Sequence, residues 1–184
     1  DDIGELRQRL GLQRPYILWC GTREPRKNLR RLLEAHRALP GDLRQRYPLV
    51  LAAGHGWLHE ELAEQLRRDP HVRLLGRVRA PDLVALYNGT ALFVYPSLAE
   101  GFGLPPAEAL ACGAPVLTSN TTSLPEVVGD AAETVDPEDQ DALFSALRDL
   151  LLDPERRREL GRRGPARAAR FTWDETARKL LDLA

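Results

Sequence analysis

Short apolar runs recur along the first 135 residues of the chain, and amphipathic segments separate them. An apolar run between turn residues is typical of a strand that is buried in a parallel sheet. We expect such strands over residues 16–20, 49–53, 72–75, 91–95, 116–118 and 133–135. Because strands and helices alternate at short spacing, the pattern predicts an α/β fold, a Rossmann-like parallel sheet flanked by helices with right-handed crossovers.

After residue 137 the pattern becomes wholly helical, so the fold is expected to end in an all-helical tail. Ser123 and Thr172 each stand three residues before a glutamate, which is the spacing of a capping box at a helix start. No internal repeat and no low-complexity linker interrupts the chain, so residues 1–184 are predicted to form a single domain. The predicted helices include residues 2–10, 82–88, 138–152, 154–170 and 173–183.

Residues 96–108 combine an unusual turn with the start of a helix. Pro96 ends the strand before the turn, because proline cannot donate to a strand ladder. Gly101 and Gly103 allow backbone conformations that other residues avoid, and they allow a ligand to approach the main chain closely. Pro105 suits the first turn of the helix that follows, so this stretch is predicted to be a strand–turn–helix corner.

Two acids bracket this turn, Glu100 at the end of the strand and Glu108 one turn into the helix. Ligands bind at the carboxyl ends of strands in open α/β sheets, so both acids are expected to face the ligand crevice. Between them, the N–H groups of Phe102, Gly103 and Leu104 form a concave set of donors that suits an anion. The alternative is a corner with two solvated glutamates, but the combination of these features favours a binding site.

A basic turn follows the first predicted strand and contains Arg23, Arg26 and Lys27. It precedes a predicted helix with apolar residues on one face, and cations there oppose the helix dipole. Helix stability therefore does not explain these cations, whereas a bound phosphate would. Lysine is rare in this chain, since 24 of the 26 basic residues are arginine, and a compact ammonium differs from a planar guanidinium at a phosphate. A solvated basic turn is the alternative interpretation.

Composition narrows the class of protein. Hydrophobic residues make up 43% and charged residues 29%, and the net charge of −1 provides no field that favours nucleic acid or an anionic membrane. No apolar stretch approaches the ~20 residues that span a bilayer, and no signal peptide opens the chain. Cys20 and Cys112 lack metal-ligand spacing and are predicted to be buried, reduced thiols, as suits a cytoplasmic protein. Neither a metal nor a cofactor is expected. The lack of methionine and the start within a helical pattern predict a piece of a longer protein.

The two glutamates seven residues apart around Gly-Phe-Gly resemble the donor-binding signature of the retaining GT-B glycosyltransferases, of the family 4 or group 1 type. Five other segments match the same pattern in order, so the resemblance covers nearly the whole chain. It implies that the chain is the C-terminal, donor-binding half of a GT-B fold. The turn over 24–28 is similar to that of bacterial mannosyltransferases that use GDP-mannose. The other matching segments are 21–28, 54–58, 75–78, 113–116 and 123–127.

The resemblance also implies roles for residues of the acid-bracketed turn. Glu108 would hold the ribose hydroxyls of the donor. Glu100 would bind sugar hydroxyls beside the reacting carbon, and it is catalytic only in the sense of positioning and charge stabilisation. The amides of Phe102, Gly103 and Leu104 would contact the phosphate or the sugar.

In the remaining loops, the resemblance implies that Arg26 and Lys27 neutralise the diphosphate. Many family members carry arginine directly after the first-turn glycine, where this chain has Thr22, so Arg23 is an alternative to Arg26. Gly54 opens a second glycine turn at the same edge of the sheet. The backbone at Val78 would meet the base.

The implied activity is retaining transfer of a sugar from a nucleoside-diphosphate sugar, GDP-mannose or a UDP-sugar, which is a substrate. The acceptor would be bound by an N-terminal domain of the longer protein, so the chain alone is expected to be inactive in transfer. No nucleic acid partner is expected, and the full protein is expected in the cytoplasm, peripheral at the inner membrane face. A GT-B-like sugar-nucleotide epimerase and a non-catalytic nucleotide-binding or interaction module remain alternatives. The arginines of 155–170 would face an acidic partner, a membrane surface or solvent.

Overall fold

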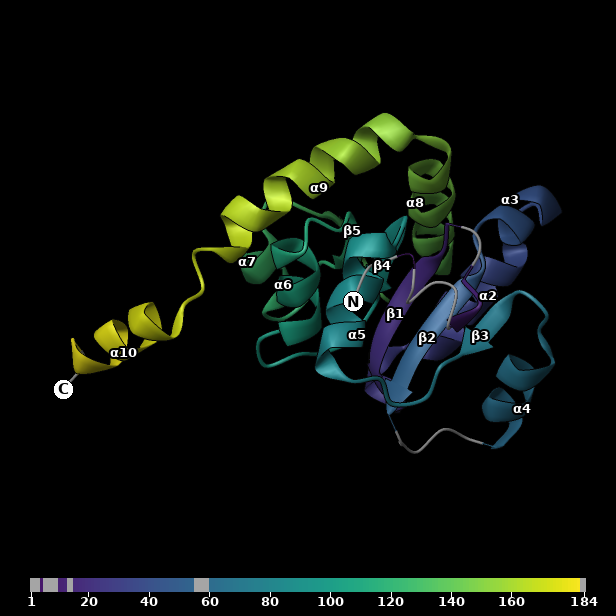
Figure 1. Ribbon diagram of the computed structural model, residues 1–184, viewed down its shortest axis with the longest axis horizontal. Helices are drawn as coiled ribbons and strands as arrows, with labels where there is room; N and C mark the ends of the chain where they lie inside the picture. Colours follow the sequence, from purple (N-terminus) through teal and green to yellow (C-terminus); the bar gives the residue numbers. More distant parts are fainter. Residues whose placement is uncertain (1–3, 5–9, 13–14, 55–59, 183–184) are drawn as a thin grey trace.

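The computed structural model describes residues 4, 10–12, 15–54 and 60–182 (Figure 1). The expected helix over 2–10 falls largely outside these residues, as does most of the glycine turn over 54–58. In the described part of the chain, six parallel strands form one sheet in the order β3-β2-β1-β4-β5-β6. The strands are β1 (Ile17–Thr22), β2 (Leu49–Gly54), β3 (Val72–Leu74), β4 (Leu92–Tyr95), β5 (Val116–Ser119) and β6 (Glu133–Val135). All six predicted strands are therefore confirmed, with ends that differ by no more than a few residues.

The four central strands are buried along nearly all of their length, and their apolar residues explain why sequence alone identifies them. Trp19 in β1 and Phe93 in β4 have no exposed surface, because helices cover both faces of the sheet. The strands β3 and β6 at the two edges are only partly buried, and each tolerates a charged residue, Arg73 and Glu133. The registers place Trp19 beside Leu51 and Leu18 beside Phe93.

The helices form two groups on opposite faces of the sheet (Figure 1). From β1 to β2 the chain moves one way across the sheet, and from β4 to β5 it moves the other way. Right-handed crossovers therefore place α2 and α6 on different faces. Helix α8 packs on α2, whereas α5, α7 and α9 pack on α6. The described helices are η1 (Pro25–Lys27), α2 (Leu29–Ala38), α3 (Gly41–Arg46), α4 (Glu60–Arg68), α5 (Ala80–Gly89), α6 (Leu104–Ala111), α7 (Leu124–Val128), α8 (Gln140–Leu152), α9 (Pro154–Ala168) and α10 (Trp173–Leu181).

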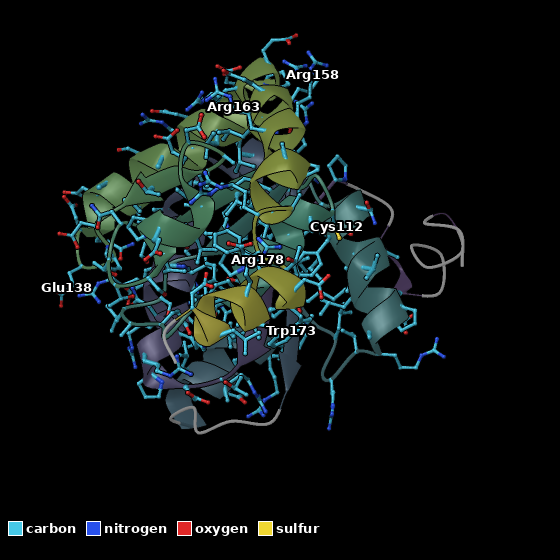
Figure 2. The ribbon with its side chains drawn as sticks, turned by 90° about the vertical axis from the view of Figure 1, so that its left-hand side faces the viewer. Cys112, Glu138, Arg158, Arg163, Trp173 and Arg178 are labelled. Atoms are coloured by element: carbon cyan, nitrogen blue, oxygen red, sulfur yellow. The ribbon has the colours of Figure 1, made fainter. Side chains whose placement is uncertain are left out.

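The arginines of α9 hold the tail onto the domain. Arg156 contacts Glu133 of β6 at 3.1 Å, and Arg157 donates to the carbonyls of Leu150 and Leu151 at the end of α8. Arg163 and Arg167 reach carbonyls of Asp130 and Val127 near α7. Figure 2 shows Arg158 and Arg163 along α9. Most of this charge therefore bonds within the chain rather than forming only a solvated face.

Helix α10 stands away from the rest of the chain (Figure 1). Its first residue, Trp173, is 84% exposed and lies on the helix that Figure 2 shows toward the viewer. One of the two hydrogen bonds of the capping box predicted at its start is present, because the Thr172 hydroxyl accepts from the Glu175 amide at 3.1 Å. Among the described residues, no helix is both long and apolar enough to cross a membrane. Cys20 is buried as predicted, whereas Cys112 is only partly buried.

Close packing of α6 on α9 depends on Gly161 and Gly164. A Cβ atom at Gly164 would lie 2.7 Å from the carbonyl oxygen of Leu110 and 3.2 Å from its Cα, so the two helix backbones would have to separate. We expect Gly164→Ala to lower the unfolding free energy by about 1–3 kcal/mol, as overpacking does. Helix propensity alone would predict a gain of up to ~1 kcal/mol. Urea unfolding measures the sign, and Gly41→Ala is the control, since Gly41 has no neighbour within 4 Å.

Candidate functional site

The predicted site lies between β1 and β4, at the point where the order of the strands in the sheet reverses. The chain leaves β1 toward one face and β4 toward the other, so their two loops separate at the carboxyl edge of the sheet. Ligand crevices of open α/β sheets occur at such a switch point. The two loops are hydrogen-bonded together, because the carbonyl oxygen of Arg26 accepts from the Leu98 amide at 2.8 Å, and the Ser97 hydroxyl oxygen lies 3.0 Å from the same carbonyl.

Lys27 lies between these two loops and is buried, with 6% of its surface exposed. Its ammonium is 2.5 Å from Oε1 of Glu100, donates to the hydroxyl of Tyr95 and lies 5.0 Å from the centroid of the Tyr95 ring. Asn28 ends η1 in the left-handed conformation, which asparagine tolerates better than most residues, and its amide donates to the carbonyl of Pro137. The turn that places Lys27 is therefore fixed on both sides.

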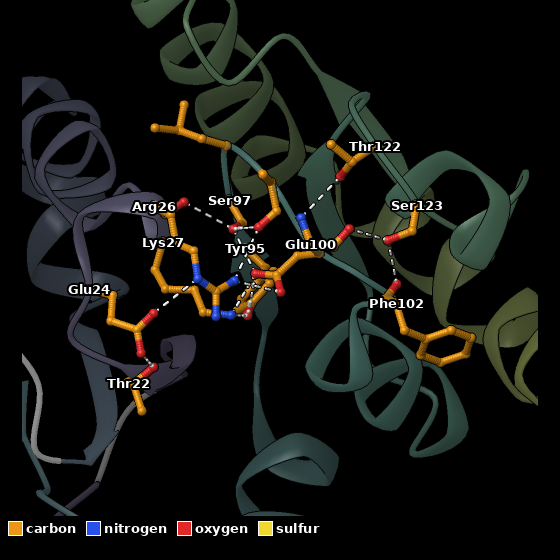
Figure 3. Close-up of polar contacts among 12 residues, drawn as sticks. Thr22, Glu24, Arg26, Lys27, Tyr95, Ser97, Glu100, Phe102, Thr122 and Ser123 are labelled. Atoms are coloured by element: carbon orange, nitrogen blue, oxygen red, sulfur yellow. Dashed lines mark hydrogen bonds and ion pairs between the residues drawn. The ribbon is translucent and has the colours of Figure 1, made fainter.

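The carboxylate of Glu100 accepts hydrogen bonds from four side chains (Figure 3). Oε1 accepts from Lys27, from the Ser97 hydroxyl at 2.7 Å and from the Tyr95 hydroxyl at 3.0 Å, while Oε2 accepts from Arg26 at 3.0 Å. Burial alone would raise the pKa of Glu100. The hydrogen bonds from Lys27 and Ser97, together with the charge of Lys27, outweigh burial, so the pKa lies below its usual value. Glu100 is therefore a carboxylate.

Arg26 contributes the more exposed cation of the pair. Its side chain is 47% exposed, and its guanidinium bridges Glu100, Glu24 and the carbonyl of Ala99. The structure thus brings three predicted site residues together, Arg26, Lys27 and Glu100. These residues pair with one another and with Glu24, so the site contains a network of ion pairs.

The loop after β5 and the start of α7 hold the turn over residues 100–103 in place. Gly103 has a φ of 99° and precedes α6, and a Cβ there would lie 2.6 Å from Cδ2 of Leu124. The Ser123 hydroxyl donates to the carbonyls of Glu100 and Phe102, at 3.0 and 2.9 Å. The capping box predicted at Ser123 is therefore wrong, because its hydroxyl bonds to the turn instead of capping α7.

The apolar residues of the turn are open to solvent. Phe102 is 39% exposed and Leu104 is 61% exposed, although the Phe102 ring packs edge-on against Phe171, with centroids 5.4 Å apart. Phe171 belongs to the segment between α9 and α10. This contact ties the turn to the helical tail.

Glu108 lies on the exposed face of α6, one turn after Leu104. Its Oε2 accepts from the hydroxyl of Tyr87 at 3.1 Å, and Tyr87 itself is buried in α5. The two acids of the signature are therefore both anchored by a tyrosine, Glu100 by Tyr95 and Glu108 by Tyr87.

The other predicted residues lie toward β2 and β3. Arg23 donates to the carbonyl of Gly54 at 3.3 Å and lines a small hollow of about 100 Å³ with Arg77. Val78 packs partly against the core in the loop after β3. The sequence analysis left Arg23 and Arg26 as alternatives for the contact with the diphosphate. In the structure the two lie apart, since Arg26 contacts Glu100 whereas Arg23 faces the end of β2.

A hollow of about 580 Å³ lies at the opposite edge of the sheet. Thr90, before β4, and Pro115, before β5, line it together with Arg157 of α9, and none of the predicted site residues does. In the part of the chain that the structure describes, no group of three or more histidine, cysteine or acidic residues could hold a metal ion.

Several residues of the site were missed from the sequence. Tyr95, Ser97, Thr122, Ser123 and Tyr87 all contact the signature acids or the turn. The place of Tyr95 and Ser97, at the carboxyl end of the central strand, is the one signal that could have identified them.

Comparison with known proteins agrees with this geometry. Residues 2–167 match the family described as Glycosyl transferases group 1. The chain is 45% identical over 170 residues to the O-antigen chain mannosyltransferase B of Escherichia coli, covering 91% of the chain and 45% of the relative. It is 40% identical over 187 residues to the serotype-specific mannosyltransferase WbdA of Escherichia coli, covering 98% of the chain and 23% of the relative.

Among solved structures, the sucrose-phosphate synthase of Thermosynechococcus elongatus superimposes with a TM-score of 0.82 at 28% identity. The match covers 98% of the chain and 47% of that structure. The chain therefore spans less than half the length of each protein to which it is compared here.

Proposed function

The chain belongs to the group 1 glycosyl transferases, and from this premise we propose that it is the donor-binding half of a retaining mannosyltransferase. In this proposal it binds GDP-mannose, and an N-terminal domain of the longer protein binds the acceptor. The observation that carries the proposal is the convergence of Lys27, Arg26 and Glu100 at the switch point of the sheet. Both curated relatives are named as mannosyltransferases, which supports mannose over other sugars.

The ion pairs of Glu100 with Arg26 and Lys27 can be exchanged for contacts with the donor when it binds. The diphosphate takes the cations of Lys27 and Arg26, and the sugar hydroxyls take the carboxylate of Glu100, which as an ionised acid only accepts. During transfer the cations stabilise the charge that develops on the departing diphosphate. Glu100 then stays beside the sugar, where its role is positioning and charge stabilisation.

The remaining groups complete the donor site. Amides of the turn over 102–104, at the start of α6, donate to the phosphate or the sugar. Glu108 accepts from the ribose hydroxyls, and the loops at Gly54 and Val78 lie toward the base. Arg23, near the end of β2, is a third cation available to the donor. The proposal needs no metal or cofactor, because the donor is a substrate and these cations take the diphosphate charge.

A calorimetric panel of GDP, UDP and ADP tests the proposal. We expect the chain to bind GDP most tightly, and to gain about 2.7 kcal/mol of unfolding free energy when GDP is present at 100 times its dissociation constant. Preference for UDP would replace GDP-mannose by a UDP-sugar. Binding of none of the three would contradict donor binding altogether.

Sugar transfer separates this function from its alternatives. A GT-B-like epimerase interconverts the free nucleotide sugar without an acceptor, and a non-catalytic binding module does neither. Assays of the longer protein with GDP-mannose, with and without acceptor, distinguish all three. We place the longer protein in the cytoplasm, at the inner face of the membrane, and one relative is named as an O-antigen chain mannosyltransferase.

Replacement of Glu108 tests the ribose contact. Glu108→Gln removes the charge from one or two hydrogen bonds, each worth roughly 1.5–3 kcal/mol. We expect the dissociation constant of GDP to rise about tenfold or more by calorimetry, with little change in melting temperature. Glu138→Gln, an exposed acid outside the site, is the matched control. An unchanged affinity would remove Glu108 from the donor site.

Replacement of Lys27 tests the diphosphate contact. We expect Lys27→Ala to weaken GDP binding far more than guanosine binding, because only the diphosphate carries the charge that Lys27 neutralises. Arg30→Ala, an exposed cation on α2, is the control. Equal losses for GDP and guanosine would mean that Lys27 acts on the base or on the fold.

A further inference from the structure

A buried pair behind the signature helix has no role in the function described so far. The hydroxyl of Tyr87 lies 2.8 Å from the sulfur of Cys20, the fourth residue of β1, and 3.1 Å from Oε2 of Glu108. Tyr87 is 2% exposed and Cys20 is 4% exposed. The Tyr87 ring packs edge-on against Phe93, with centroids 5.3 Å apart, so its position is fixed by the core.

The number of protons fixes the direction of this chain of hydrogen bonds. A tyrosine hydroxyl has one proton, and an ionised carboxylate only accepts, so Tyr87 donates to Glu108. The Cys20 thiol must then donate to the Tyr87 oxygen. Both groups keep their protons for this purpose, because burial raises the pKa of Cys20 to about 12 and raises that of Tyr87 well above its usual range.

This chain of hydrogen bonds ends at Oε2 of Glu108. Glu108 is otherwise an exposed glutamate on a helix surface, and such a side chain loses rotamer freedom when a ligand fixes it. A donor from the core fixes Oε2 in advance and leaves the rest of the carboxylate for a ligand. Preorganised acceptors bind more tightly because less freedom is lost on binding.

We propose that Tyr87 is a positioning residue, which holds the Glu108 carboxylate for the ribose hydroxyls of the donor, and that Cys20 supports Tyr87 from the core. The proposal rests on the ribose contact of Glu108 proposed above. It predicts that loss of the Tyr87 hydroxyl affects only ligands that carry ribose hydroxyls.

The test compares GDP with 2′,3′-dideoxy-GDP by calorimetry on the wild-type chain and Tyr87→Phe. We expect the wild type to bind GDP at least about tenfold more tightly than the dideoxy form. Tyr87→Phe should weaken GDP binding about 5- to 20-fold and dideoxy-GDP binding less than about twofold, since the lost hydrogen bond involves a charged group. In the Glu108→Gln background, the effect of Tyr87→Phe on GDP should disappear.

Cys20→Ala is a second variant that leaves the tyrosine ring and hydroxyl in place. We expect a smaller loss, about twofold, again confined to GDP, because the thiol acts only by polarising Tyr87. This variant tests the proposal even where Tyr87→Phe proves unstable.

Three outcomes would overturn the proposal. Equal losses for both ligands would show that Tyr87 serves the fold, and no loss would show that Glu108 needs no support. A wild type that binds GDP and dideoxy-GDP equally would remove the ribose contact of Glu108 and, with it, the role of Tyr87. In that last case GDP binding itself, and hence donor binding, would still stand.

Discussion

Glu100→Ala should lower the unfolding free energy of the chain by about 3–5 kcal/mol, the usual effect of removing one partner of a buried ion pair. The substitution leaves the ammonium of Lys27, whose side chain is 7% exposed, with only the Tyr95 hydroxyl as a partner. Arg26 is half-exposed and can turn to water. The loss therefore arises at Lys27, and urea unfolding at pH 7 measures it.

Removing the other partner should cost less. In Lys27→Ala the carboxylate of Glu100 keeps Arg26, Tyr95 and Ser97 as donors. We expect the double variant Lys27→Met, Glu100→Gln to be closer to the wild type than Glu100→Ala, because no charge is left buried without a partner. A larger loss for Lys27→Ala than for Glu100→Ala would contradict the network described here.

The same network sets a dependence of stability on pH. The pKa of Glu100 is lowered in the folded chain, so its contribution is fully present above the pKa that the carboxyl has when unfolded. It is lost as the pH falls through the folded value. The difference in unfolding free energy between the wild type and Glu100→Gln should therefore shrink in acid.

The chain alone should bind GDP yet transfer mannose at least about a thousandfold more slowly than the same chain joined to an N-terminal half. Positioning of two reactants contributes roughly 7–11 kcal/mol in well-oriented cases, and in the proposed function the other half holds the acceptor. The comparison is a fusion of this chain to the remaining part of the O-antigen chain mannosyltransferase B, assayed with the acceptor of that enzyme.

GDP affinity is the control for this comparison, since it should agree within a few-fold between the chain and the fusion. Transfer by the chain alone within about tenfold of the fusion would contradict the proposal that two halves are needed. A fusion that binds GDP but transfers nothing would show that the two halves are not matched, and the longer natural protein would then replace it.

The sheet was predictable because the apolar residues of its central strands form short runs between turn residues, as is typical of buried strands. The short helices α3 and α4 were not predicted. Their polar sequences are stabilised by contacts that a local pattern does not show, such as that of Asp69 with Arg37 and Arg44. Capping at Thr172 was predictable because the contact is local. Ser123 has the same pattern, but carbonyls more than 20 residues away take its hydroxyl.

The site was predictable as a set of residues but not as a set of contacts. Motif spacing identified Lys27 and Glu100, which are 73 residues apart in the sequence, but nothing in the spacing indicates that they bond to each other. Nor does helix periodicity distinguish Tyr87, which supports Glu108, from an ordinary core tyrosine. Such pairings depend on how β1, β4 and α5 pack, and that is decided by the whole fold.

The ion pairs of Arg26 and Lys27 have a consequence for which phosphate compounds the site selects. Arg26 and Lys27 are matched by Glu24 and Glu100, so the four side chains carry no net charge. A crevice with two unpaired cations would attract any polyanion, from inorganic phosphate to nucleic acid. In the proposed function a phosphate competes with the Glu100 carboxylate for these cations, and the hydroxyls of the donor sugar would give that carboxylate new partners. We therefore expect free phosphate to compete poorly with the complete nucleotide sugar, even when it is in large excess.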